Sequence, residues 1–148
     1  MLRTICRVAA LATGCTVLAF GAGTAVASAN TISALPTEAP IINKLYVPIP
    51  LTVSCSPGYY GFPRNLSVTI RQVVQGNTIA HGTSSMSVTC DDTPHDYTVN
   101  VFPDGSAYGS SASAPFKKGD AAISAAVTNY YSYPPTPVTA GPQSIRLK

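Results

Sequence analysis

The sequence has 148 residues, of which 45% are hydrophobic and 10% charged, with a formal net charge of +3. This length is enough for one domain with a single hydrophobic core. The basic residues are scattered along the sequence rather than gathered in a stripe, which argues against nucleic-acid binding.

Residues 1–29 have the form of a secretory signal peptide. Arg3 and Arg7 supply a positive start, Val8–Phe20 supply an apolar run, and Ala27-Ser28-Ala29 has the small-x-small form of a cleavage site. About 13 mostly apolar residues are too few to span a bilayer. We therefore expect cleavage after Ala29, with Ala27 as the alternative, and a secreted monomer that is not attached to the membrane after cleavage.

A second way of processing this segment is lipidation at Cys15, because Ala12-Thr13-Gly14 faintly resembles a lipobox. The apolar run continues past Cys15 to Phe20, where a mature lipoprotein would turn polar, so we favour soluble export. Loss of residues 1–29 removes two of the nine basic residues. The rest of the chain is then nearly neutral, with seven Lys and Arg against six Asp and Glu.

Two cysteines remain after the expected cleavage, Cys55 and Cys90. Each ends an alternating apolar and polar segment, Leu51–Cys55 and Met86–Cys90, and each falls on the apolar side of the alternation. Both should therefore point into one core, and an even pair in an exported chain predicts a disulfide. The bridge closes a loop of about 35 residues, which is worth roughly 3–4 kcal/mol in the chain-entropy model.

Short alternating segments separated by turn residues indicate an all-β fold. All thirteen prolines lie beyond the expected signal and leave few windows for a helix. Pro48 and Pro50 should bound the first strand, and turns at Gly76-Asn77 and Gly82 should separate later ones. The expected strands are Ile41–Val47, Leu51–Cys55, Leu66–Arg71, Thr78–His81, Met86–Cys90, Tyr97–Val101 and Ala121–Val127.

About seven short strands predict an antiparallel sandwich with one disulfide, and an immunoglobulin-like topology is the leading version. The absence of Trp and the short cysteine spacing depart from antibody-type domains, so we place Cys90 on the fifth strand. We expect a signal peptide at 1–29, a flexible arm at 30–40, the sandwich at 41–130 and a Pro-rich tail at 131–148. Ile145 and Leu147 could pair as a short terminal strand or stay loose.

Four motifs carry a resemblance to a known group of proteins. They are Leu51-Thr52-Val53-Ser54-Cys55, Val68-Thr69-Ile70-Arg71-Gln72, Val88-Thr89-Cys90-Asp91 with His95 and Tyr97, and Phe116-Lys117-Lys118-Gly119-Asp120-Ala121. Over roughly residues 50–128 the chain resembles small exported single-disulfide β-sandwich proteins of actinobacteria. Those proteins have no assigned activity, so the resemblance implies a fold and export and supplies no catalytic residue.

Asp91, Asp92, His95 and Asp96 form the one dense group of possible metal ligands. Carboxylates suit calcium, but the alternating donors, central glycine and distal glutamate of a calcium loop are missing. We therefore expect a turn held by Asx-type hydrogen bonds, and neither a metal site nor a cofactor. A metal-dependent enzyme centred on this segment is the less favoured alternative, and a Ser-His-Asp triad using His95 and Asp96 lacks a nucleophile-elbow motif.

Aromatic side chains crowd one loop, where Tyr59, Tyr60 and Phe62 lie between Pro57 and Pro63. Aromatic residues on the loops of a rigid sandwich are suited to contacting sugars or proteins. The other interpretation is that these rings plug the end of the core. We expect a non-catalytic binding module for a cell-wall glycan or a protein partner, with a purely structural secreted domain as the alternative.

Overall fold

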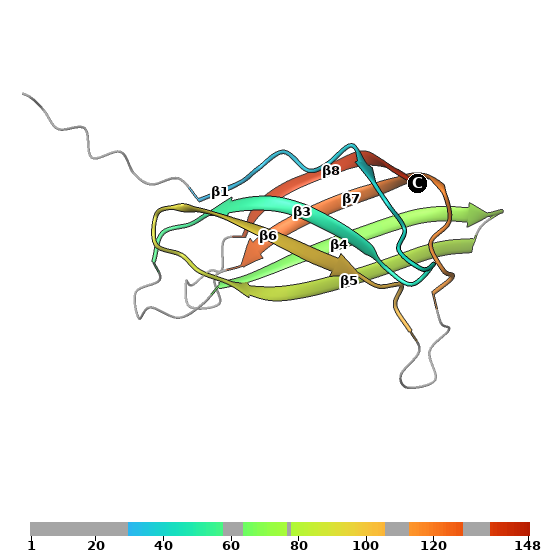
Figure 1. Ribbon diagram of the computed structural model, residues 1–148, viewed down its shortest axis with the longest axis horizontal. Coiled ribbons are helices and arrows are strands. Elements are labelled where there is room, and N and C mark those ends of the chain that lie inside the picture. Colours follow the sequence, from blue (N-terminus) through green and yellow to red (C-terminus); the bar gives the residue numbers. More distant parts are fainter. Residues whose placement is uncertain (1–29, 58–63, 77, 106–112, 129–136) are drawn as a thin grey trace, which may run out of the picture.

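The computed structural model describes residues 30–57, 64–76, 78–105, 113–128 and 137–148 (Figure 1). Every regular element in these residues is a strand. The strands are β1 (Thr31–Ile32), β2 (Glu38–Ala39), β3 (Val47–Ser54), β4 (Arg64–Gln75), β5 (Thr78–Val88), β6 (Pro94–Val101), β7 (Gly119–Thr128) and β8 (Val138–Leu147). Within the described residues, no helix has the length and hydropathy needed to cross a lipid bilayer.

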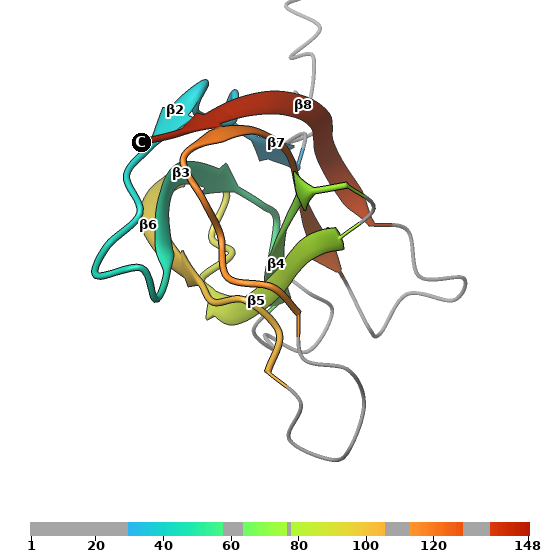
Figure 2. The ribbon, with the colours of Figure 1, turned by 90° about the vertical axis from the view of Figure 1, so that its right-hand side faces the viewer.

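The strands form two sheets that face each other across the core (Figure 2). One sheet has three strands in the order β1-β3-β6, and the other has five in the order β2-β8-β7-β4-β5. The predicted all-β class is confirmed. The predicted antiparallel pairing holds except at β2 and β8, which run parallel. β2 lies near the start of the described chain and β8 near its end, so a long stretch of chain connects them. Parallel strands need such a long connection, because a tight hairpin can join only antiparallel strands.

The core is built by alternation of buried and outward-facing residues along the strands. On β4, for example, Leu66, Val68 and Ile70 are buried while their neighbours face outward. Opposite them, Ile49, Leu51 and Val53 of β3 point inward from the three-stranded sheet. The two inward-facing rows form one continuous hydrophobic cluster, which is the core of the described residues.

The predicted Cys55–Cys90 disulfide is present. Cys55 directly follows β3 and is buried, whereas Cys90 lies two residues beyond the end of β5 rather than on the strand. Because β3 and β5 belong to different sheets, the disulfide ties the two layers together at one end. The Asp92 amide also donates to the Cys55 carbonyl, at 3.1 Å, beside the bridge.

Pro48 and Pro50 lie inside β3, whereas we expected them to bound a strand at 41–47. The Ile41–Val47 segment instead contains a tight turn with a single bridge between Ile42 and Tyr46. In a strand, alternate amides point to the same edge, and the Thr52 amide points away from β6, toward Ser33. The nitrogens of Pro48 and Pro50 face that same edge, where β1 no longer pairs, so no ladder hydrogen bond is lost.

The prediction of two strands separated at Gly82 was wrong, because β5 runs unbroken through this residue. Gly82 is needed for close approach rather than for a turn. A Cβ at this position would lie 2.2 Å from the Phe102 carbonyl oxygen and 2.9 Å from Cζ of Phe116. The lack of a side chain therefore lets the segment after β6 lie against the β5 edge.

Both described ends of the chain belong to the sandwich. Residues 30–40, which we expected to form an arm outside it, contribute β1 and β2 and bury Leu35 and Ala39. Residues 138–147, expected within a tail, form the ten-residue strand β8 between β2 and β7. The sequence hides β8 because Gly141 and Pro142 interrupt its alternation at a shift in register against β7.

Candidate functional site

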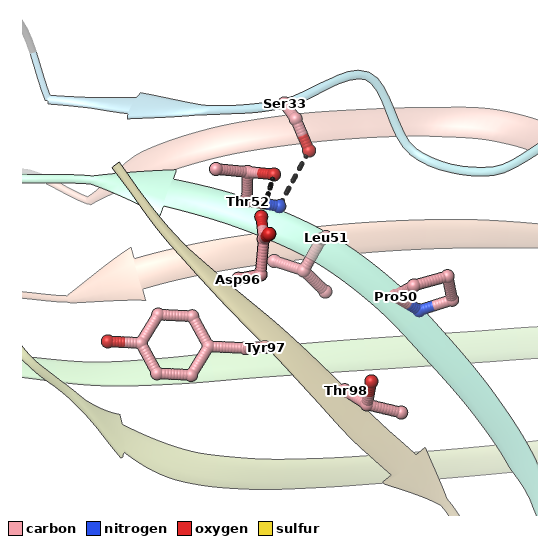
Figure 3. A pocket seen from close by; sticks show the side chains of 7 residues that line it. All are labelled: Ser33, Pro50, Leu51, Thr52, Asp96, Tyr97 and Thr98. Atoms are coloured by element: carbon pink, nitrogen blue, oxygen red, sulfur yellow. Dashed lines mark hydrogen bonds between the residues drawn. The ribbon is translucent and has the colours of Figure 1, made fainter. Parts of the chain in front are cut away.

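A shallow hollow lies on the outer face of the three-stranded sheet (Figure 3). The β3–β6 register places Pro50 opposite Thr98 and Thr52 opposite Asp96. These four residues alternate with inward-facing core residues, so their side chains point toward solvent. We call this surface the β3–β6 hollow; it has a volume of about 370 Å³ and is lined by Ser33, Pro50, Leu51, Thr52, Asp96, Tyr97 and Thr98.

The polar groups of the β3–β6 hollow are held in place by hydrogen bonds. The Thr52 hydroxyl donates to Oδ1 of Asp96 at 2.7 Å, and the Thr52 amide donates to Oγ of Ser33 at 2.9 Å. Figure 3 shows Ser33, Thr52 and Asp96 meeting over β3, while the Tyr97 ring points away from them. The Tyr97 hydroxyl instead accepts a hydrogen bond from the Thr89 amide at 2.8 Å.

This arrangement offers hydroxyls and one carboxylate beside the apolar ring of Pro50. Groups of these kinds can hydrogen-bond the hydroxyls of a neutral ligand and cover its C–H faces. All of these groups except the Ser33 hydroxyl sit on the paired strands β3 and β6, and Ser33 is held by its hydrogen bond with Thr52. Little conformational entropy would therefore be lost when a ligand binds. We did not single out Ser33 or Thr98 from the sequence, because alternation places them on an outer face without showing which residues meet there.

The Asp91–Asp96 segment contains the predicted Asx-type turn. The Thr93 amide and hydroxyl both donate to Oδ1 of Asp91, at 3.1 and 2.6 Å. The His95 ring nitrogen Nε2 lies 2.8 Å from the same oxygen. These contacts, led by the Thr93 hydroxyl and then the His95 ring, lower the pKa of Asp91 from 3.8 to about 2.

The structure does not pair His95 with Asp96, the acidic residue that the triad would need. His95 contacts Asp91 rather than Asp96, and Asp96 accepts a hydrogen bond from Thr52. Among the described residues, no group of three or more His, Cys, Asp and Glu side chains is arranged to hold a metal ion. The geometry of this segment is that of a hydrogen-bonded turn beside the disulfide.

The second histidine, His81, pairs with Asp104 through Nδ1 and Oδ2. A nearby serine, Ser113, accepts a hydrogen bond from the His81 backbone amide at 2.6 Å rather than from the ring. Asp104 also accepts from the Thr83 amide at 3.2 Å. These contacts join the segment after β6 to the outer edge of β5, and an edge covered in this way is protected from pairing with another chain.

The predicted aromatic contact residues Tyr59, Tyr60 and Phe62 lie outside the described residues, as does the expected signal peptide at 1–29. Their role therefore stays a prediction. Comparison with known proteins finds no family model, no curated protein and no solved structure that matches the chain.

Proposed function

We propose that this chain is an exported, non-catalytic binding domain with an immunoglobulin-like topology, and that its β3–β6 hollow binds a neutral cell-wall glycan. The observation that carries the glycan proposal is the ordered Thr52–Asp96 pair at the centre of the hollow. A purely structural secreted domain is the competing function, and a protein partner is the competing ligand. The experiments below separate these alternatives.

The order of the strands supports the immunoglobulin-like topology. In such domains the second and fifth strands pair in one sheet, and the third, sixth and seventh form the other. Here β3 and β6 correspond to the first pair, and the order β8-β7-β4-β5 corresponds to the second sheet with one added strand. The short strands β1 and β2 would divide the first strand between the two sheets, which accounts for the parallel pairing of β2 with β8.

The chemistry of the β3–β6 hollow supports a neutral, hydroxyl-rich ligand. Asp96 is the one charged residue among those that line it. A sugar can donate a hydroxyl to this carboxylate while its C–H face lies on Pro50, and charge-assisted hydrogen bonds of this kind are strong. Because little of the attraction would be between net charges, binding should depend weakly on salt.

Export and binding are consistent with the scaffold. Disulfides are typical of oxidising compartments, and this one ties the two sheets together at one end. The export proposal has its own test in mass spectrometry of the protein from the culture medium. A chain beginning at Asn30 is expected, and a chain retaining Cys15 with an acyl group would overturn it.

The glycan proposal is tested by retention on an insoluble cell-wall fraction. Asp96→Asn removes the negative charge of the hollow and Thr98→Val removes one hydroxyl, and we expect each to weaken retention several-fold to about tenfold. Asp120→Asn is the matched control, because Asp120 is an exposed carboxylate on β7 of the other sheet. Melting temperatures should stay within a few degrees for all three variants.

Two results would reject the glycan proposal. Equal retention of Asp96→Asn, Thr98→Val and wild type would move the site away from the hollow. No retention of the wild type, together with no partner recovered from secreted proteins, would favour the structural domain.

The aromatic loop is tested in the same assay with Tyr59, Tyr60 and Phe62 all changed to Ala. Loss of retention in a variant that still melts cooperatively would make this loop part of the binding site. A triple variant that unfolds would instead identify the rings as core plugs.

A further inference from the structure

All four lysines of the sequence line one cavity. They are Lys44, Lys117, Lys118 and Lys148, which span more than a hundred positions in the chain. The cavity has a volume of about 440 Å³, within the range of small-molecule sites. We call it the lysine cavity. It is separate from the β3–β6 hollow, shares no lining residue with it, and leads to an inference beyond the proposed function.

The pairing of β2 with β8 brings two parts of the lysine cavity together. The Lys148 amide donates to the Ala39 carbonyl at 3.0 Å, and the Ile41 amide donates to the Lys148 carbonyl at 2.9 Å. Lys148 and Ile41 therefore lie side by side although they come from opposite ends of the described chain. Both line the cavity.

A buried glutamine fixes the segment that carries the next two lysines. The Gln72 side chain is 4% exposed and bonds the backbone of Lys117 twice. Its Nε2 donates to the Lys117 carbonyl at 2.7 Å, and its Oε1 accepts from the Lys117 amide at 2.9 Å. The backbone at Lys117 is thus anchored to the core, while the side chains of Lys117 and Lys118 remain exposed at the cavity.

The fourth lysine occupies a backbone conformation that lysine rarely adopts. Asn43 and Lys44 have φ angles of 51° and 59°, and the Leu45 amide donates to the Ile42 carbonyl at 2.9 Å to close the turn. Two successive positive φ angles are typical of a type I′ turn, in which glycine is favoured. Lysine is less stable than glycine in this backbone conformation, but it places an ammonium group at the cavity.

The remaining lining of the lysine cavity is apolar. Phe116 is buried, and Ile41 and Pro115 lie beside it. Among the described residues that line the cavity there is no Asp or Glu. Of the four lysines, Lys148 alone has a carboxylate of the described residues, that of Glu38, within ion-pair distance. Three ammonium groups beside an apolar surface therefore have no ion pair with a carboxylate of the described residues.

We propose that the lysine cavity binds an organic phosphate monoester with a compact apolar body. The phosphate carries close to two negative charges at neutral pH, which suits several ammonium groups better than a single carboxylate would. The apolar body covers Ile41, Pro115 and Phe116. The concave shape favours such a small ligand over a flat membrane surface.

The test is isothermal titration of the full exported chain with 1-naphthyl phosphate. We expect saturable one-to-one binding that weakens as salt rises from 50 to 500 mM. Inorganic phosphate lacks the apolar body and 1-naphthol lacks the charge, so each should bind at least about tenfold more weakly. Absence of saturable binding, or equal binding of inorganic phosphate, would overturn the proposal.

Charge-removing variants locate the site. Lys118→Gln should weaken binding by about 2- to 5-fold, as expected for one exposed ion pair, and Lys117→Gln with Lys118→Gln by about tenfold. Arg71→Gln is the matched control, because Arg71 is an exposed positive charge on β4 that does not line the cavity. Equal losses for Arg71→Gln and Lys118→Gln would mean a non-specific charge effect and would overturn the proposal.

Lys44→Gly separates binding from folding, because the two effects have opposite signs. Glycine relieves the strain of the positive φ, so the melting temperature should hold or rise, while the affinity for 1-naphthyl phosphate should fall.

A parallel sedimentation assay uses phosphatidylglycerol and phosphatidylcholine vesicles. Lysine-dependent sedimentation with phosphatidylglycerol, without saturable binding of 1-naphthyl phosphate, would assign the lysines to a membrane surface and reject the cavity ligand.

Discussion

Gly141 lies in β8, the strand that the sequence pattern did not reveal as a full element, and it allows this strand to pack closely against β7. Its φ is 86°, and a Cβ would lie 2.6 Å from the carbonyl oxygen of Ile123 on β7. We predict that Gly141→Ala lowers the free energy of unfolding by about 2–3 kcal/mol, through backbone strain together with this steric clash. Urea denaturation measures the change.

Gly76→Ala is the control for Gly141→Ala. Gly76 also has a positive φ, of 55°, but a Cβ there would meet no atom within 4 Å. Its substitution should cost about 1 kcal/mol. Equal costs at the two positions would show that the close approach of β7 and β8 at Gly141 contributes nothing.

A second prediction at the residue scale concerns Asp91. Its folded pKa, about 2, lies below the ordinary value of 3.8, so the charged carboxylate is favoured by the folded turn. The resulting stability is fully present above about pH 4 and is lost as the pH falls toward 2. Titration of the Asp91 carboxyl by NMR should give a midpoint near 2, and Asp91→Asn should remove this step from the acid unfolding profile. A midpoint near 3.8 would contradict the hydrogen bonding described for this turn.

At the scale of elements, the Gln72 side chain links β4 to the segment before β7. We predict that Gln72→Leu lowers the free energy of unfolding by about 1–3 kcal/mol, because both backbone groups of Lys117 lose their partner. Hydrogen exchange at the Lys117 amide should accelerate. Gln75→Leu, at the exposed end of the same strand, should change neither quantity. A variant Gln72→Leu as stable as wild type would refute the anchoring role.

The elements that could be predicted from sequence are those whose alternation is uninterrupted. Leu66–Ile70, Val99–Val101 and Ile123–Val127 read as strands because each alternates buried and outward residues. Strand β8 was missed as a full element because Gly141 breaks that alternation. Likewise, Gly82 resembles a turn residue in sequence, and the Phe102 carbonyl and the Phe116 ring packed against it explain its presence within a strand. Local pattern cannot report a contact with a distant segment.

At the scale of the whole molecule, the disulfide is the covalent link between the sheets. We predict that Cys55→Ala with Cys90→Ala lowers the free energy of unfolding by about 3–4 kcal/mol, because the unfolded chain regains the freedom of a 35-residue loop. Thermal melting of the double variant and of reduced wild type should give similar losses. Two free thiols in protein from the culture medium would contradict the bridge.

Neither candidate site could be predicted from the sequence, in contrast to two local features. The disulfide and the Asp91 turn depend on residues with strong local rules, and both were predicted. The lysine cavity was not, since Lys44, Lys117 and Lys148 are scattered in sequence and meet only through β2–β8 pairing and the Gln72 anchor. The Thr52–Asp96 pair was likewise invisible, because its register requires knowing that β3 pairs with β6.

The central claim is that the outer face of the three-stranded sheet binds glycan. It is tested most directly by NMR titration of the isotope-labelled chain with soluble cell-wall glycan fragments. We predict saturable shifts at the amides of Thr52, Asp96 and Thr98, little changed by salt, and no shifts at Lys117 or Lys118. The absence of saturable shifts, or shifts confined to residues outside the β3–β6 hollow, would contradict the claim.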